Sequence, residues 1–190
     1  MVQIVMLYGY ARAGKDTLAD GLSIGSKNGM VRLSFASYLK AAVAEAVSCF
    51  VKVDYANETD KLQDRDLLVE FGRAVRRRNP LAFAQCLCQD MYNHDKWPEV
   101  FATRGGSYVI TDARYFNEYQ HVTQWAKEHG HPVVSVYVWR EGNSYANIEE
   151  RDSIREVLEH VKFDYLIDGE AYDADNVRQK GIDLAKTLNL

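Results

Sequence analysis

Short apolar runs alternate along the chain with longer stretches in which apolar residues recur three and four positions apart. The short runs predict buried β-strands, and the longer stretches predict α-helices. Pro80 and Gly130 mark the ends of two predicted helices, because proline cannot continue a helix and glycine often caps its C-terminus. The predicted strands cover residues 2–8, 30–35, 108–111, 132–138 and 163–167. The predicted helices cover residues 15–27, 36–50, 81–92, 119–129, 143–162 and 172–188. One more helix is predicted after a charged stretch at residues 57–66, and it ends at Asn79.

This alternation predicts an α/β fold. Strands separated by helices form right-handed βαβ units, which build a doubly wound parallel sheet. Residues 132–138 are nearly all apolar, as a strand buried on both faces requires. Because ligands of such sheets bind beyond the C-terminal ends of the strands, we expect five parallel strands, helices on both faces, and a ligand site where the strands end.

Residues 9–17, which we call the P-loop, read Gly-Tyr-Ala-Arg-Ala-Gly-Lys-Asp-Thr and directly follow the first strand. The spacing G-x-x-x-x-G-K between a strand and a helix is that of a phosphate-binding loop. Successive backbone N–H groups can point at phosphate oxygens only where bulky side chains are absent, and the following helix adds the positive end of its dipole. The predicted nucleotide-binding residues are Gly9, Arg12, Ala13, Gly14, Lys15, Asp16 and Thr17. The fold expected is therefore a three-layer P-loop NTPase fold with a small lid and acceptor-binding insertion.

Three residues are candidates for holding Mg²⁺. The usual motif has Ser or Thr after the lysine, whereas this chain has Asp16 followed by Thr17. Either Thr17 binds the metal, or Asp16 reaches it directly or through water. Asp112 closes an apolar strand, where P-loop proteins place a carboxylate for Mg²⁺ or its water, and its alternative role is to cap the helix that begins near Asn117.

Composition narrows the function classes. The chain of 190 residues suits a single domain, residues 1–190, and its 47% apolar and 26% charged residues are ordinary for a globular protein. A net charge of −4 argues against a general nucleic-acid binder. The spacing of Cys49, Cys86 and Cys88 fits neither a zinc site nor a disulfide framework, which suits a reducing cytoplasm. The lack of a long apolar run argues against a membrane span, and the strand at the start argues against a signal peptide.

Arginines supply the remaining candidates. Arg73, Arg76 and Arg77 lie at helical spacings i, i+3 and i+4, so one helix face carries three guanidinium groups. A bound phosphate would relieve their mutual repulsion; alternatively they are solvated or pair with Glu70 and Asp66. Candidates for a mobile lid at about residues 140–162 are Arg140, Arg151 and Arg155, although Arg155 is also placed to pair with Glu159.

Four segments, in order, resemble the bacteriophage-type deoxynucleoside monophosphate kinases. They are the Gly-Lys-Asp-Thr of the P-loop, residues 34–40 (Ser-Phe-Ala-Ser-Tyr-Leu-Lys), residues 65–72 (Arg-Asp-Leu-Leu-Val-Glu-Phe-Gly) and residues 110–118 (Ile-Thr-Asp-Ala-Arg-Tyr-Phe-Asn-Glu). The chain departs from the family at Gly72-Arg73-Ala74, where the family has Gly-Thr-Glu, and around Asp168-Gly169, where the family has Asn. The family's H-x-S-E segment near the C-terminus is not recognisable.

The resemblance implies a cytoplasmic enzyme (in the host cytoplasm if phage-encoded) that transfers the γ-phosphoryl of ATP to a deoxynucleoside 5′-monophosphate. The products are dNDP and ADP, Mg²⁺ is required, and no covalent intermediate forms. The resemblance also implies that a helical region at about residues 36–95 binds the acceptor. Catalytic candidates are Lys15, Arg114, Arg140 and Arg151, and substrate-binding candidates are Lys40, Arg65, Arg73, Arg77 (which matches an arginine of the family), Asp112 and Arg155.

Two other functions stay open. One is a P-loop kinase for another small phosphorylated acceptor, of the phosphomevalonate or dephospho-coenzyme A type. The other is a nucleotide-binding regulatory NTPase. The chain has no N-K-x-D segment for recognising guanine, which argues against this function. The expected partners are ATP and the monophosphate, with no nucleic-acid polymer and no membrane. The sequence does not decide the base, the sugar or whether the chain forms a homodimer.

Overall fold

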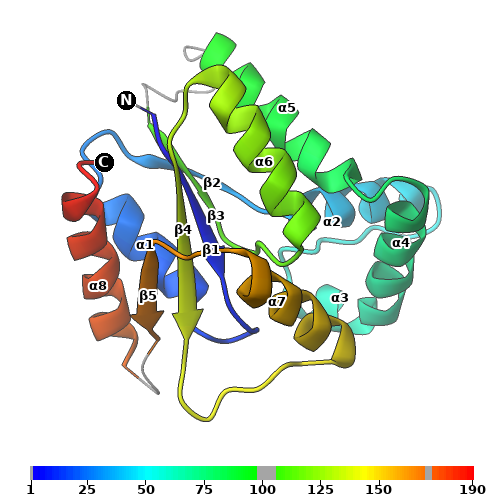
Figure 1. The fold of residues 1–190 in the computed structure, drawn as a ribbon. Helices are drawn as coiled ribbons and strands as arrows, with labels where there is room; N and C mark the ends of the chain where they lie inside the picture. The colour runs from blue at the N-terminus through cyan, green and yellow to red at the C-terminus, as the bar shows by residue number, and fades with distance from the viewer. Residues whose placement is uncertain (1, 98–105, 170–172) are drawn as a thin grey trace.

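The computed structural model describes residues 2–97, 106–169 and 173–190, and it contains one five-stranded parallel sheet (Figure 1). The strands are β1 (Ile4–Tyr8), β2 (Met30–Leu33), β3 (Ser107–Ile110), β4 (Val133–Trp139) and β5 (Tyr165–Asp168). Their order is β2-β3-β1-β4-β5, and every neighbouring pair is parallel. The predicted α/β class and five-stranded parallel sheet are confirmed.

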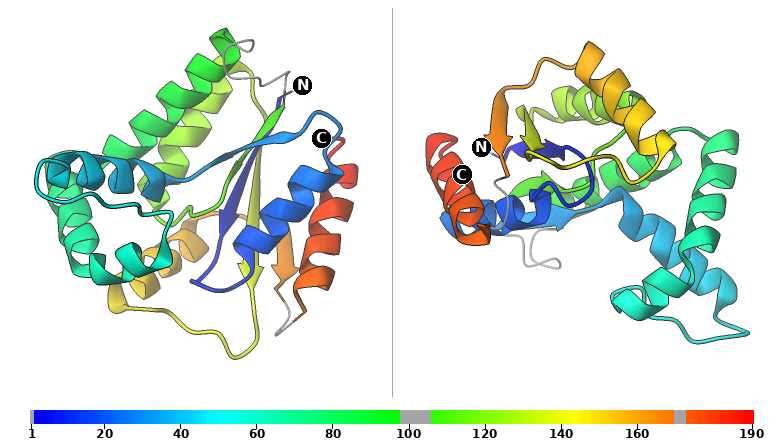
Figure 2. Two further views of the ribbon diagram at one scale, coloured as in Figure 1. Left: turned by 180° about the vertical axis from the view of Figure 1, so that it is seen from behind. Right: turned by 90° about the horizontal axis from the view of Figure 1, so that it is seen from below.

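Helices cover both faces of the sheet, which gives three layers (Figures 1 and 2). Val5 and Leu7 of β1 share a core with residues of α1 (Lys15–Gly25) and α8 (Ala174–Thr187). The alternate residues Ile4, Met6 and Tyr8 share a core with α5 (Ala82–Lys96), α6 (Phe116–His129) and α7 (Ile148–His160). All five residues of β1 are fully buried, as a central parallel strand requires.

A group of helices projects to one side of the sheet (Figure 2, right). It consists of α2 (Phe35–Val47), α3 (Glu58–Gln63) and α4 (Arg65–Arg78). Helices α2 and α4, with Tyr55 from the segment after α2, form a small core of Val43, Tyr55 and Leu68. None of the helices described is long and apolar enough to cross a membrane.

Several predicted boundaries were wrong. The helix predicted over 143–162 covers only Ile148–His160, because the Asn147 side chain accepts a hydrogen bond from the Glu150 N–H and caps the helix there. The helix predicted from residue 119 starts at Phe116. Part of the charged stretch at 57–66 forms α3, which was not predicted. Residue 172, the predicted start of the last helix, lies outside the described residues.

Candidate functional site

The P-loop makes a tight turn between β1 and α1. Gly9 and Gly14 have φ angles of 135° and 98°, in the region that favours glycine. A Cβ on Gly9 would lie 2.1 Å from the carbonyl oxygen of Val138, so the neighbouring strand leaves no room for a side chain. Gly14 is the N-cap of α1, and the first N–H groups of that helix therefore open towards the turn. This backbone geometry suits an anion.

Lys15 folds back over the loop. Its Nζ donates hydrogen bonds to the carbonyl oxygens of Gly9 and Tyr10, at 2.7 and 2.8 Å. Burial lowers the pKa of the ammonium group, and the negative charges of Glu150 and Asp16 oppose that shift. The lysine is thus held beside the turn as a cation with neutral oxygen partners, which a phosphate oxygen could replace.

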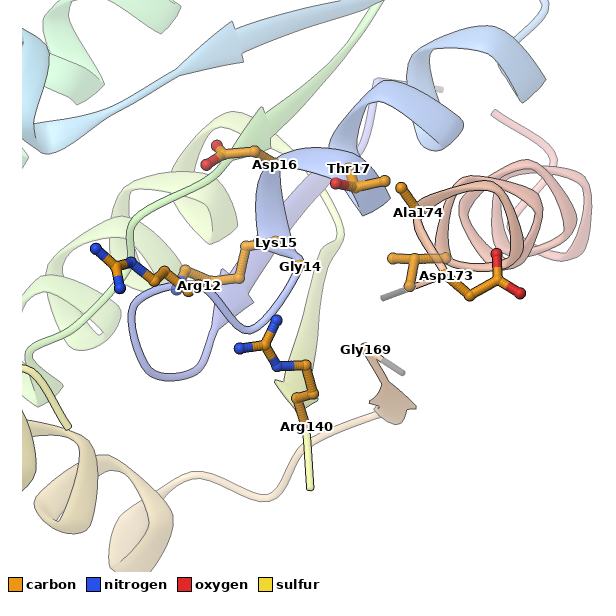
Figure 3. Close-up of a pocket in the computed structure, with 10 residues that line it drawn as sticks. Arg12, Gly14, Lys15, Asp16, Thr17, Arg140, Gly169, Asp173 and Ala174 are labelled. Atoms are coloured by element: carbon orange, nitrogen blue, oxygen red, sulfur yellow. The ribbon is translucent and has the colours of Figure 1, made fainter. Parts of the chain in front are cut away.

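A cavity of about 320 Å³ opens beside the turn (Figure 3). Arg140, just after β4, points towards the loop (Figure 3), and Gly169 follows β5 directly. The carboxyl ends of β1, β4 and β5 therefore meet at one site, as expected for a parallel sheet. The lining residues are Arg12, Gly14, Lys15, Asp16, Thr17, Arg140, Gly169, Asp173, Ala174 and Val177.

The cavity carries more positive than negative charge. Among the described residues, neither Arg12 nor Arg140 makes an ion pair with a carboxylate. The Asp173 side chain accepts a hydrogen bond from the Asn176 N–H at 2.9 Å, so it also serves to cap α8. Two guanidinium groups and one ammonium group thus line a space that a polyanion would neutralise.

The two residues after Lys15 differ in their surroundings. The Asp16 carboxylate pairs with Arg32 of β2 and points away from Arg140 and Gly169 (Figure 3). Arg32 also pairs with Asp20 at 3.1 Å. Thr17 lines the cavity without such a competing ion pair. Both residues line the cavity, and the Asp16 carboxylate is the one held by an arginine.

Asp112 contacts a helix that the sequence analysis did not connect with it. One carboxylate oxygen accepts a hydrogen bond from the Phe35 N–H at 2.9 Å. The other accepts from the Ala36 N–H at 2.8 Å and from Ser34 Oγ at 2.9 Å. Asp112 therefore caps α2, and the alternative that it caps the helix near Asn117 was wrong. The helix near Asn117 is α6, and its N-cap residue is Tyr115, whose N–H donates a hydrogen bond to the Glu118 carboxylate.

Three arginines meet carboxylates between α4, α7 and the segment after β3. Arg114 donates to Glu150 at 3.1 Å, and Arg73 donates to Glu149 at 3.1 Å and to Glu70 at 2.6 Å. The third, Arg76, lies between two rings, with its guanidinium carbon 4.8 Å from the Phe83 centroid and 4.6 Å from that of Tyr115. Its Nη2 is 3.6 Å from Glu118, and burial raises the pKa of that carboxyl group to about 7.

The remaining candidates are not brought to the cavity. Arg155 pairs with Glu159 at 3.0 Å, as its alternative interpretation anticipated, and Arg151 pairs with Asp152 at 2.8 Å. Within the described chain, Lys40, Arg65 and Arg77 form no ion pair and line no part of the cavity; Arg65 and Arg77 are exposed. Arg76, rather than Arg77, is the arginine of α4 that faces inward.

Sequence reasoning did not select Glu149, Glu150, Gly169 or Asp173. Gly169 and Asp173 could have been found, because they follow the last predicted strand, where ligands bind in such sheets. Glu149 and Glu150 gave no such signal, since charged residues on a helix are usually solvated.

Comparison with known proteins bears on the fold alone. No family model matches the sequence, and no curated protein is similar to it in sequence. The solved structures that are similar include an unliganded sugar kinase from Janibacter sp. HTCC2649, with a TM-score of 0.53, 9% identity, and coverage of 100% of this chain and 97% of that one. Another is APE1195, with a TM-score of 0.49, 15% identity and the same two coverages.

Proposed function

We propose that the protein is a kinase that transfers the γ-phosphoryl group of ATP to a deoxynucleoside 5′-monophosphate. The observation that carries the proposal is the cavity beside the P-loop, which combines positive-φ glycines, a helix N-terminus and three cations, Arg12, Lys15 and Arg140. A triphosphate matches this arrangement in charge and in hydrogen-bonding capacity. A phosphotransfer reaction is also what the name of the sugar kinase with a similar fold indicates for that protein.

Mg²⁺ would be held by few protein atoms. In the part of the chain that the structure describes, no three His, Cys, Asp or Glu side chains gather as a metal site. Magnesium at such sites usually keeps several waters and binds one or two protein groups together with substrate phosphates. The Thr17 hydroxyl fits that role, while Arg32 occupies Asp16 and the α2 N-terminus occupies Asp112. The metal would supply charge neutralisation at the phosphates.

The reaction needs positioning and charge stabilisation. An oxygen of the acceptor phosphate forms a bond to the γ-phosphorus while the bond from that phosphorus to the β-bridging oxygen breaks, so ADP leaves. Lys15 and Arg140 stabilise the charge on the donor phosphates, and Arg114 faces the acceptor. A phosphate monoester at neutral pH needs no base, and no side chain has to remove a proton.

The choice of acceptor rests on the sequence segments 34–40, 65–72 and 110–118. In the structure the first forms the start of α2, the second forms the first half of α4, and the third runs from the end of β3 to the start of α6. Asp112 joins the third segment to the first through its bonds to Ser34, Phe35 and Ala36. The first and third of these segments therefore contact each other beside the sheet, where a second substrate could meet the P-loop.

Initial rates with each of the four deoxynucleoside and four ribonucleoside monophosphates, at fixed ATP and Mg²⁺, test the proposal. We expect ADP and a nucleoside diphosphate with at least one deoxynucleotide, and a loss of at least about 100-fold in kcat for Lys15→Ala. Transfer only to another phosphorylated metabolite would reassign the acceptor. Slow hydrolysis that no acceptor accelerates would contradict a kinase.

A further inference from the structure

Glu150 is a buried carboxylate that lies outside the cavity. It belongs to the first turn of α7, and its side chain is 2% exposed. Three donors bind its two oxygens: Oε1 accepts from the Ala11 N–H at 3.0 Å and from Arg114 Nη2 at 3.1 Å, and Oε2 accepts from the Ala146 N–H at 2.6 Å. A carboxylate this well satisfied holds one position, since any displacement would leave a buried charge without partners.

The same segment binds the P-loop a second time. Asn143 Nδ2 donates to the carbonyl oxygen of Ala11 at 2.9 Å. Both polar backbone groups of Ala11 are therefore bound by residues 143–150. The next residue, Arg12, has a φ angle of 63°, a conformation that non-glycine residues adopt rarely and keep only where their surroundings enforce it. The two bonds to Ala11 provide such enforcement directly beside the residue that lines the cavity.

Arg114 is oriented by the other half of the contact. A guanidinium group has five N–H donors, and the bond from Arg114 to Glu150 uses one of the two N–H donors on Nη2. The remaining donors stay available to a phosphate. Among the described residues, Glu150 is the partner with which Arg114 forms an ion pair. Fixing one edge of the guanidinium group therefore decides where its other donors point.

We propose that Glu150 is a positioning residue that holds the P-loop turn and Arg114 in one fixed relation. The inference rests on the proposed phosphotransfer function, because it joins the loop that would hold the donor to an arginine that would face the acceptor. Glu150 touches neither substrate and acts through Ala11 and Arg114. Misplacement of reacting groups by about 1 Å can cost on the order of 100-fold in rate, so such an anchor matters for kcat.

The test compares Glu150→Gln and Glu150→Ala with Glu156→Gln, which changes an exposed glutamate on the same helix. We expect kcat to fall by about 10- to 100-fold in both Glu150 variants, with a smaller rise, under about fivefold, in the KM for ATP. Glu156→Gln should match the wild type. Thermal unfolding and circular dichroism confirm that each variant is folded at the assay temperature. If Glu150→Ala does not fold, Glu150→Gln carries the comparison.

A double variant separates positioning from general stability. Because Arg114 is one of the two groups through which Glu150 acts, Glu150→Ala should lower kcat by a smaller factor in an Arg114→Ala background than in the wild type. Effects on kcat that multiply, or a Glu150→Gln enzyme as fast as Glu156→Gln, would overturn the inference while leaving the proposed function intact. Wild-type protein that neither binds ATP nor transfers phosphate would overturn both.

Discussion

Gly169 lies where β5 meets the P-loop, and backbone atoms fill the space around its Cα. Its N–H donates to the Trp139 carbonyl at 2.6 Å. A Cβ at this position would lie 1.9 Å from the Ala13 carbonyl oxygen, so the P-loop or the strand end would have to move. Neither group is the flexible end of a side chain. The absence of a side chain is thus a condition for the shape of the cavity.

We expect Gly169→Ala to weaken ATP binding at least about tenfold and to lower the free energy of unfolding by about 1–3 kcal/mol. Calorimetry with ATP and Mg²⁺ and urea unfolding would measure the two effects. The control is Gly130→Ala at the end of α6, where φ is 75° but no atom lies within 4 Å of the added Cβ. It should cost stability without changing ATP affinity, and equal affinities in both variants would contradict the steric argument.

Glu118 predicts a pH dependence of stability. Burial raises the pKa of its carboxyl group from 4.5 to about 7, even though the nearby Arg76 favours the charged form. Between these two values the folded protein retains a proton that the unfolded chain has lost, so stability falls as the pH rises through this interval and levels off above it. This difference between the pKa values of the folded and unfolded states corresponds to at most about 3 kcal/mol in the free energy of unfolding.

Glu118→Gln removes this titration. The free energy of unfolding of the wild type should fall by about 2–3 kcal/mol more than that of the variant between pH 5 and pH 8. Urea unfolding at the two pH values measures the difference, and Glu156→Gln serves as the exposed control on α7. Parallel curves for wild type and Glu118→Gln would show that the carboxyl group keeps an ordinary pKa in the folded protein.

Helix α2 depends on a residue from another part of the chain. Its N-cap residue, Ser34, makes no side-chain bond to the helix, and the first two N–H groups instead donate to Asp112. Asp112→Asn removes the negative charge and places an amide N–H₂ group against at least one of these donors. We expect the free energy of unfolding to fall by about 1–3 kcal/mol, measured by urea unfolding.

The control for Asp112 is Asp66→Asn, an exposed carboxylate in the first turn of α4. Its loss should cost less than about 1 kcal/mol, because among the described residues Asp66 forms no ion pair and the dipole of α4 is what favours its charge. The Mg²⁺ concentration for half-maximal rate provides a second measurement. A marked rise in that concentration without a loss of stability would assign the Asp112 carboxylate to the metal and not to the helix.

Elements were predicted from the sequence where the signal is local. The short apolar runs identified the five strands, and Gly130 identified the end of α6. The start of α7 was missed, because residues 143–147 are mostly polar, like the helix that follows, and no change in hydrophobicity marks the Asn147 cap. The Asp112 contact was also missed, since the two partners are 76 and 77 residues apart in the chain.

The same distinction holds for the site as a whole. The P-loop is contiguous, so its turn and its glycines could be recognised directly, and Arg140 followed from its place at a strand end. The bond between Glu150 and Ala11 spans 139 residues and depends on how α7 packs beside the P-loop. No pattern in either segment encodes that packing. Sequence patterns therefore predicted the part of the site on one loop better than the part assembled by tertiary contacts.

The cavity joins distant parts of the molecule, so ligand binding should stabilise the entire fold. Its lining comes from the P-loop near the N-terminus, from Arg140 after β4, and from Gly169, Asp173 and the start of α8. The helices α1 and α8 also pack closely, with Gly21 and Gly181 at their contact. A ligand that bridges these elements opposes their separation, and at 100 times its Kd it contributes about 2.7 kcal/mol.

For a chain of this length that free energy corresponds to a rise in Tm of roughly 5–10 °C. Scanning calorimetry with saturating ATP and Mg²⁺ measures it. Adenosine, which lacks the phosphates, should shift Tm by less than about 2 °C, because the cations Arg12, Lys15 and Arg140 act on the phosphate chain. Lys15→Ala should lose most of the ATP shift while remaining folded. Equal shifts with adenosine and ATP would mean that the cavity binds the base and leaves the P-loop without a phosphate-binding role.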